Sequence, residues 1–410
     1  MKQGIIKSKG VIHYGYVIVF CCCLIMGINV GLVISCAGIF YQPISQELGV
    51  SVGKLGIYMS LNYLFSSLAL SVAGRMMEKY SARLLLTVSS VVMGACLVGM
   101  SFFDSVWEFY VAGGVLGITL AFLLYLSFPI LVNRWFKTRV GFFIGVCSAA
   151  SGIGGVLFNP LGAYLITEYG WRMTYGIFGA IILLVVTPLI GLLLRDYPKD
   201  KGMQPYGETP VAQAVKPNEG IEYARALRMP EFYGLLLFAF LMISVSTLNL
   251  FVPDYVTGLS FSLKEAAFVA SAVMIGATIG KVALGAINDY NNKFGVLATF
   301  VSGAVGLALL LGGHWVGLWL TIVGGFFFGW AYAGVSVQTL MLVRTVFGSK
   351  NYAQIYSNIS IAFACGGALT AGGWGLLADH IGYSVILCLG ILFLTLSAGI
   401  GFYALRKKLY

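Results

Sequence analysis

Hydrophobic residues occur along the chain in long runs that short polar intervals separate. Each run approaches the roughly 20 apolar residues that an α-helix needs to cross a bilayer. We therefore predict twelve membrane-spanning helices, at residues 14–42, 52–73, 84–103, 107–133, 140–167, 173–194, 232–256, 266–287, 295–313, 317–343, 351–377 and 382–405. The longest polar interval, 195–231, follows the sixth run and contains five prolines. The pattern predicts two six-helix bundles, within 1–194 and 232–410, which this interval joins as a linker.

The composition is typical of a polytopic membrane protein. Of the 410 residues, 59% are hydrophobic and 10% are charged, and the mean hydropathy is +0.91. A soluble domain carries about 25% charged residues. The 53 glycines suit close packing between helices in lipid. We expect an all-α, multi-pass membrane protein.

The 25 lysines and arginines are spread thinly between the hydrophobic runs, so the net charge of +10 does not indicate nucleic-acid binding. If the N-terminus is cytoplasmic, 21 of them fall on the inner side of the membrane. Three fall on the outer side: Lys54, Arg172 and Lys264. Cytoplasmic loops are enriched in basic residues. The count predicts cytoplasmic N- and C-termini and a place in the cytoplasmic (cell inner) membrane.

Lys281 is the one basic residue that this count leaves inside a span. It lies about two helical turns before Asn288 and Asp289, the polar residues that end the eighth run. A cation inside a bilayer costs roughly 2.5–3.5 kcal/mol on insertion scales, so it needs a compensating partner. We expect the function of the chain to depend on that partner.

Other reactive side chains give little sign of catalysis. The eight cysteines fall inside hydrophobic runs without metal-ligand spacing, so we expect no metal site and no cofactor. No nucleophile, metal set or acid–base pair appears in the spans, which argues against an enzyme. No Asp or Glu lies mid-span. Asp254, at the end of the seventh span, is the candidate for proton coupling, and its alternative role is an interfacial helix cap.

A short motif, Gly-x-x-x-acid followed by basic residues, occurs once in each half. The first copy contains Gly74, Glu78 and Arg83, and the second contains Gly285 and Asp289. The glycine permits neighbouring helices to approach closely, and the acid at a helix end can pair with basic groups. The twelve spans, the linker and this repeated motif resemble the major facilitator superfamily. The resemblance implies two bundles that rock around a midplane site, with the motif as a gate.

Further segments resemble the branch of this superfamily that holds oxalate–formate antiporters and monocarboxylate porters. They lie at residues 133–136, 139–141, 151–155, 198–207, 226–232 and 347–352. In its eighth span that branch carries Arg-x-x-x-Gly-x-x-x-Asp, and the arginine binds a substrate carboxylate. This chain matches the pattern with Lys281, Gly285 and Asp289. The resemblance therefore implies that Lys281 binds a carboxylate.

The lysine changes the chemistry of such a site. Arginine offers a rigid bidentate fork and stays charged, whereas lysine offers a point charge with rotatable donors and can release its proton. The oxalate-specific members use a second cation in the eleventh span, where this chain has Ile359 with Asn358 beside it. One cation suits one carboxylate, so we favour a monoanion over a dianion.

Aromatic and polar residues of the central spans are the other predicted substrate contacts. Tyr125 matches a substrate-facing tyrosine of that branch, and Trp330 and Tyr332 fall where the family places aromatic pocket residues. The last two are two positions apart and cannot share a helix face, so we expect only one to line the pocket. Asn358 is expected to face the cavity. Packing and hydrogen bonding between helices are the alternative roles of these side chains.

These features predict a secondary active transporter of a small organic monocarboxylate (lactate-, pyruvate- or formate-like), by proton symport or anion exchange with alternating access. The alternative within transport is an exporter of an anionic amphiphile or drug. A membrane sensor with a degenerate transporter fold would normally add an output domain, which we do not expect. The expected partners are a small organic anion, protons and the lipid bilayer, with no nucleic acid, and the chain is expected to be a monomer.

Overall fold

The computed structural model describes residues 13–207, 220–348 and 352–406, which form helices and two isolated β-bridges. The predicted cytoplasmic tails lie outside the described residues. The first half of the chain forms α1 (Gly15–Leu24), η1 (Ile25–Ser35), α2 (Gly38–Leu48), α3 (Val52–Lys79), α4 (Ala82–Met100), α5 (Val106–Leu120), η2 (Ala121–Leu126), α6 (Ser127–Trp135), α7 (Val140–Ile181), η3 (Ile182–Val186) and α8 (Thr187–Leu193). The rest forms η4 (Pro198–Lys201), α9 (Tyr223–Ala226), α10 (Pro230–Thr247), η5 (Leu248–Phe251), α11 (Val252–Gly258), α12 (Leu263–Tyr290), α13 (Asn292–Val316), α14 (Leu318–Phe347), α15 (Tyr352–Ile381) and α16 (Tyr383–Ala404).

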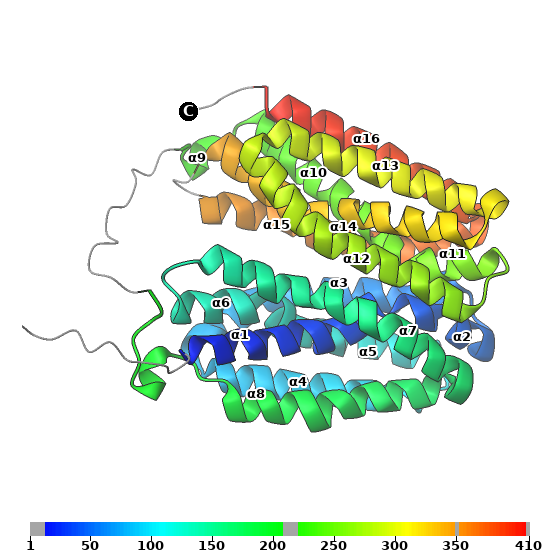
Figure 1. The fold of residues 1–410 in the computed structure, drawn as a ribbon, viewed down its shortest axis with the longest axis horizontal. Helices are drawn as coiled ribbons and strands as arrows, with labels where there is room; N and C mark the ends of the chain where they lie inside the picture. The colour runs from blue at the N-terminus through cyan, green and yellow to red at the C-terminus, as the bar shows by residue number, and fades with distance from the viewer. Residues whose placement is uncertain (1–12, 208–219, 349–351, 407–410) are drawn as a thin grey trace, which may run out of the picture.

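The helices form two bundles that lie side by side (Figure 1). Helices α1 to α8 make up one bundle, and α10 to α16 make up the other. Helices α6 and α9 lie at one end of the molecule, which we call the linker end. Helices α2 and α11 lie at the opposite end, which we call the α2–α11 end. The predicted domain boundaries at 194 and 231 fall between the two bundles and stay predictions.

The number of spans depends on how two bent helices are counted. Ten of the described helices are long and apolar enough to cross a membrane, or eleven if the bent helix α3 is one span. One of the ten, Phe142–Leu193, has 52 residues, about twice the length that a span requires. It contains Gly170, whose backbone (φ 80°, ψ 162°) is not helical. Twelve spans would require the break at Gly170 to divide the helix Phe142–Leu193 into two spans. The number of apolar helices does not confirm the predicted twelve.

Several helices are longer than the hydrophobic runs that predicted them. Helix α12 begins at Leu263 because Ser262 and Glu265 cap it: Ser262 N donates to Glu265 Oε2 (2.8 Å), and Glu265 N donates to Ser262 Oγ (3.3 Å). Helix α3 continues beyond residue 73 to Lys79 and ends where Tyr80 becomes extended (φ −113°, ψ 165°). Backbone hydrogen bonds carry a helix past its apolar stretch until the chain leaves the helical conformation, so hydropathy alone misses these ends.

Glycines bring α12 and α14 into close contact. A Cβ at Gly276 would lie 1.9 Å from the carbonyl oxygen of Phe326, and a Cβ at Gly329 would lie 2.2 Å from that of Val273. Neither position has room for a methyl group. Helices associate in lipid largely through such close packing of small residues. These contacts hold α12, the helix that carries Lys281, against α14.

The two bundles touch mainly along two helix pairs, α3 with α15 and α7 with α12, and α2 also contacts α11. Between α3 and α15, Gly372 N donates to Ser60 Oγ at 2.7 Å. Between α7 and α12, Ser271 Oγ donates to Val156 O at 3.3 Å. An ion pair joins α12 to α7 nearer the α2–α11 end, where Lys264 lies 3.1 Å from Glu168. The bundles are therefore in contact over the half of the molecule that ends at α2 and α11.

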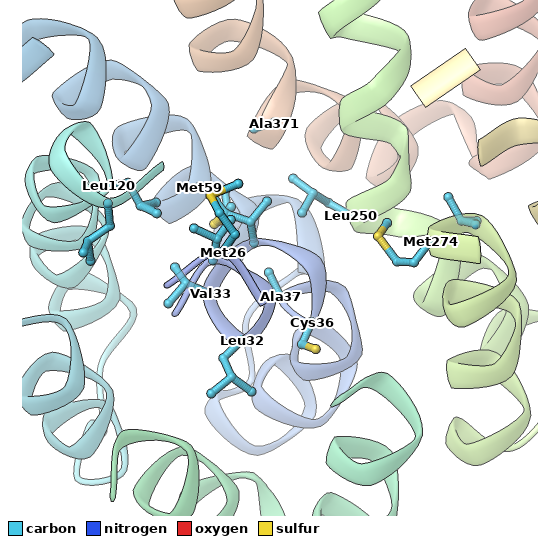
Figure 2. Close-up of a cluster of buried hydrophobic side chains, with 14 of the residues drawn as sticks. Met26, Leu32, Val33, Cys36, Ala37, Met59, Leu120, Leu250, Met274 and Ala371 are labelled. Atoms are coloured by element: carbon cyan, nitrogen blue, oxygen red, sulfur yellow. The ribbon is translucent and has the colours of Figure 1, made fainter. Parts of the chain in front are cut away.

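Buried apolar side chains from both bundles form a cluster where the bundles meet (Figure 2). Its labelled members are Met26, Leu32, Val33, Cys36, Ala37, Met59, Leu120, Leu250, Met274 and Ala371. Met274 lies seven residues before Lys281 on α12, on the side of the α2–α11 end. The cluster therefore lies between that lysine and the α2–α11 end.

The linker is anchored to both bundles. Tyr206 N donates to Trp135 O at 2.8 Å, and Lys137 N donates to Tyr206 O at 2.9 Å, at the end of α6. Ile221, after the undescribed residues 208–219, donates its N–H to Phe347 O at 2.9 Å, at the end of α14. Each bundle thus holds one end of the linker.

Candidate functional site

Lys281 lies on the side of α12 that faces α7 of the other bundle. Its Nζ donates to two oxygens of one residue, the backbone oxygen and the Oγ of Ser148, each at 3.4 Å. Ser148 belongs to α7 and Lys281 to α12, so this side chain bridges the two bundles.

Lys281 has no carboxylate partner in the described part of the chain. The three ion pairs described there are made by Arg172 and Lys264. Two neutral oxygens at 3.4 Å lie beyond the usual range of N–H···O distances and leave the ammonium weakly compensated. A half-buried cation with such partners favours the entry of an anion.

Trp330 of α14 packs against Gly280, the residue before Lys281. Its Cα and Cγ lie 3.1 and 3.3 Å from the place that a Cβ would take at Gly280. The indole Nε1 is buried and has no acceptor among the described residues. A buried tryptophan normally finds a partner for its N–H. An unpaired donor near a weakly compensated ammonium suits a ligand with more than one acceptor atom.

Tyr332, two residues further along α14, faces a different set of side chains. It lies within electrostatic range of Tyr125, in η2, and of Tyr63, in α3. Tyr125 also interacts with Ser66. The ring of Tyr63 reaches the second bundle, because a Cβ at Gly367 of α15 would lie 2.7 Å from it. Tyr63 and Tyr125 of the first bundle thus lie in the same region as Tyr332 of the second. Trp330 instead lies against Gly280 of α12, so Trp330 and Tyr332 have different neighbours.

Asn358 is bound to the linker in this conformation. Its Nδ2 donates to the hydroxyl of Tyr223 at 3.0 Å and to the backbone oxygen of Gln354 at 3.0 Å. Tyr223 is the first residue of α9, at the linker end. The amide nitrogen is therefore occupied, and the predicted contact of Asn358 with substrate stays a prediction that this arrangement does not favour.

Asp254, the predicted proton-coupling residue, lies at the α2–α11 end. Its carboxylate accepts a hydrogen bond from the hydroxyl of Tyr383. Asp379 lies within electrostatic range of both residues. No described hydrogen bond or ion pair joins Asp254 to Lys281, so any coupling between them acts through the movement of helices. Its role stays a prediction.

Both copies of the repeated glycine motif are open at the linker end. A Cβ at Gly74 or at Gly285 would meet no atom of the described residues within 4 Å. Glu78 and Asp289 are exposed, and the ion pairs of the described segments do not include them. Arg83 binds within its own bundle, to oxygens of α8 and of the residues after it. The close approach expected at both glycines is not made in this conformation, which is closed at the opposite end.

Two residues of this region were not predicted from the sequence. Ser148 is one of two serines in the fifth span, and only the antiparallel pairing of α7 with α12 places it opposite Lys281. Tyr63 is one aromatic residue in an apolar run. Both depend on contacts between distant helices, which no local pattern encodes.

Comparisons with known proteins identify the family. The model of the Major Facilitator Superfamily matches residues 19–294. The uncharacterized MFS-type transporter YhjX of Escherichia coli (strain K12) is 25% identical over 80% of this chain and 80% of its own length. Monocarboxylate transporter 4 of Rattus norvegicus is 23% identical over 83% of this chain and 72% of its own length.

A solved structure shows the same fold. The crystal structure of a bacterial homolog to the human lysosomal transporter Spinster, in an inward-facing and unoccupied conformation, aligns with a TM-score of 0.73 at 16% identity. The alignment covers 97% of this chain and 98% of that one. Together with the family match and the many apolar helices, this shows that the chain belongs to the Major Facilitator Superfamily and is a multi-pass membrane transporter.

Proposed function

We propose that the chain transports a small organic anion with one carboxylate group, by alternating access around Lys281. The observation that carries this proposal is the set of partners of the ammonium group: two neutral oxygens of Ser148 on the other bundle. A single carboxylate would supply the missing charge. A relative named as a monocarboxylate transporter agrees with this substrate class.

Binding at Lys281 couples to the movement of the bundles because its present partner lies on the other bundle. A carboxylate forms a shorter, charge-assisted hydrogen bond and competes with the Ser148 oxygens. Replacing them releases α12 from α7 at this level. Neutralising the ammonium also lowers the cost of a charge within the bilayer.

Neighbouring side chains complete the proposed site. The unpaired N–H of Trp330 donates to the second carboxylate oxygen, so Trp330 is the one of the pair Trp330 and Tyr332 that lines the pocket. The hydroxyl of Tyr125 contacts the rest of the anion. Transport of the anion is driven either by proton symport, with Asp254 as the proton carrier, or by exchange of one anion for another. We propose a cytoplasmic-membrane location with both termini inside, from the distribution of lysine and arginine.

A binding screen followed by uptake tests the substrate class. The purified protein is heated with formate, lactate, pyruvate, oxalate or an anionic amphiphile at several pH values, because a bound ligand raises thermal stability by mass action. Liposome uptake of the stabilising anion, with and without a pH gradient, separates symport from exchange. Selective stabilisation by the amphiphile would instead support the exporter alternative.

Substitution of Lys281 tests the site. Lys281→Ala should weaken anion binding by about 10- to 100-fold, the loss expected for a hydrogen bond to a charged group, and should abolish uptake. Lys281→Arg keeps the charge and should retain part of both. Lys293→Ala, which removes an exposed lysine of α13, is the matched control and should behave like the parent protein. Full uptake of the anion by a membrane-inserted Lys281→Ala variant would rule out this assignment.

A further inference from the structure

We propose that Asp379 and Gly53 form a latch that holds the two bundles together at the α2–α11 end. Gly53 is the second residue of α3 in the first bundle, and Asp379 lies in the last turn of α15 in the second. A Cβ at Gly53 would lie 2.4 Å from Oδ2 of Asp379, so the carboxylate rests against the first turn of α3. The latch concerns the conformation of the transporter and does not depend on which anion it carries.

The first turn of α3 has N–H groups to offer to a carboxylate. Ser51 Oγ accepts from Lys54 N at 3.2 Å, and Leu55 N is the donor of the first intrahelical bond, to Ser51 O at 3.1 Å. The N–H groups of Val52 and Gly53 have no acceptor within the helix, as is general for a first turn. Such a turn carries a partial positive charge that a carboxylate stabilises. Asp379 supplies that carboxylate from the other bundle.

The glycines of this contact let the backbones of α3 and α15 touch. A Cβ at Gly53 would lie 2.5 Å from the backbone of Gly375. One turn along α3, a Cβ at Gly56 would lie 3.5 Å from Gly372, whose N–H donates to Ser60 Oγ at 2.7 Å. The charge contact thus lies at the end of a continuous backbone contact, where any larger side chain would separate the helices.

Other titratable groups near the latch leave Asp379 as the acid that faces α3. Asp254 and Tyr383 lie on the same bundle as Asp379, and they are bonded to each other. Tyr41, from α2 of the first bundle, lies within electrostatic range of Tyr383, and its buried hydroxyl has no partner in the described chain. Lys54, next to Gly53, is exposed and adds positive charge on the side of α3.

The same helix pair must separate for the site to open at this end. A Cβ at Gly74, near the far end of α3, would meet no described atom within 4 Å, so α3 contacts the other bundle through its first turns but not at Gly74. Withdrawal of Asp379 from α3 is then part of opening the α2–α11 end. The strength of that contact sets the fraction of molecules that are open there.

Cysteine accessibility tests the latch. Ile57→Cys places a thiol in the contact, because a Cβ at Gly372 would lie 2.9 Å from the Cα of Ile57. A membrane-impermeant maleimide is supplied on the side that the α2–α11 end faces. The parent protein measures the background from its eight natural cysteines. In the Ile57→Cys protein, Asp379→Asn should speed labelling about two- to five-fold, the factor expected for a charge at a helix N-terminus.

Two glycine variants complete the test. Gly53→Ala adds a methyl group inside the contact and should also speed labelling. Gly373→Ala adds the same group to α15 at a place where the described residues leave 4 Å of open space, and it should leave labelling unchanged. If Asp379→Asn leaves the labelling rate of Ile57→Cys unchanged, the latch is overturned. If Asp379→Asn does not reach the membrane, an unchanged labelling rate in Gly53→Ala overturns it instead. The thermal shift with the anion reports on Lys281 separately, so loss of the latch and loss of the proposed function are distinguishable.

Discussion

At the scale of single residues, the polar side chains of the spans fall into two groups. Asn288 and Gln338 exchange hydrogen bonds of 2.9 and 3.1 Å and tie α12 to α14. Lys281 has two long contacts with neutral oxygens, and Trp330 Nε1 has no acceptor in the described residues. The side chains of the first group fulfil each other's hydrogen-bonding capacity and stabilise the packing of the two helices. The second group offers donors in excess of acceptors, so it gains most from a bound anion.

Trp330→Phe separates a ligand contact from a packing contact. The substitution keeps an aromatic ring against Gly280 and removes an N–H that has no partner among the residues that the structure describes. Stability without ligand should therefore change little. Anion binding should weaken about 10- to 100-fold, the loss expected for one hydrogen bond to a charged group. Thermal unfolding with and without the stabilising anion measures both quantities, and equal affinity in the two proteins would remove Trp330 from the site.

The sequence predicted the central cation but not how it is held. Lys281 is recognisable because a lone lysine within an apolar run is costly whatever surrounds it. Ser148 is not recognisable, because its importance comes from a helix of the other bundle. Asn358 looked like a cavity residue by its place in the eleventh span, but its amide is bonded to Tyr223 of the linker, whose course near α15 the sequence does not reveal.

At the scale of elements, α12 shows how one helix serves two purposes. Gly276, in its first half, lies so close to α14 that a Cβ would be 1.9 Å from the oxygen of Phe326. At Gly285, in its second half, a Cβ would have no described atom within 4 Å. Both halves are bonded or packed within their own bundle, since Asn288 in the last turn pairs with Gln338 of α14, but only the second half leaves open space at one of its glycines.

The two glycines of α12 should respond oppositely to the same substitution. Gly276→Ala forces backbones apart and should lower the free energy of unfolding by about 1–3 kcal/mol, the usual cost of overpacking. Gly285→Ala has open space and replaces a poor helix former, so stability should be unchanged or raised by up to about 1 kcal/mol. Denaturant unfolding in detergent compares the two. A stability loss of the same size in both variants would contradict the open surroundings of Gly285.

Hydropathy located most helices of this fold but not their ends or bends. Ser262 and Glu265 extend α12 beyond its apolar run through backbone caps. The break at Gly170 lies between two predicted spans, as a polar interval would suggest, whereas the 49° bend of α3 lies inside a single predicted run. Bends of this kind follow from packing against neighbours, which a linear pattern does not contain.

At the scale of the whole molecule, the described contacts between the bundles lie toward one end, and both motif glycines face open space at the other. Gly53, Ser60 and Lys264 take part in contacts between bundles at the α2–α11 end. Gly74 and Gly285 have open surroundings at the linker end. With the orientation that the basic residues predict, this is an inward-facing state. Sequence repeats suggested the two halves, but the pairing of α3 with α15 and of α7 with α12 required the structure.

The partners of Lys281 also determine how much charge moves when the bundles rock. If the lysine keeps its proton, the empty protein moves one uncompensated positive charge through the electric field, and the protein loaded with a monoanion moves none. A charge that crosses the whole membrane changes in free energy by about 2.3 kcal/mol per 100 mV.

Net uptake by this protein should therefore respond to voltage, and one-for-one exchange of anions should not. Liposomes with an imposed potassium diffusion potential measure both rates for the same anion. Equal voltage sensitivity of the two would show that Lys281 does not carry an unpaired charge during the return of the empty protein. Because the ammonium of Lys281 has only neutral partners, the return of the empty protein is the step of the cycle that moves net charge across the membrane.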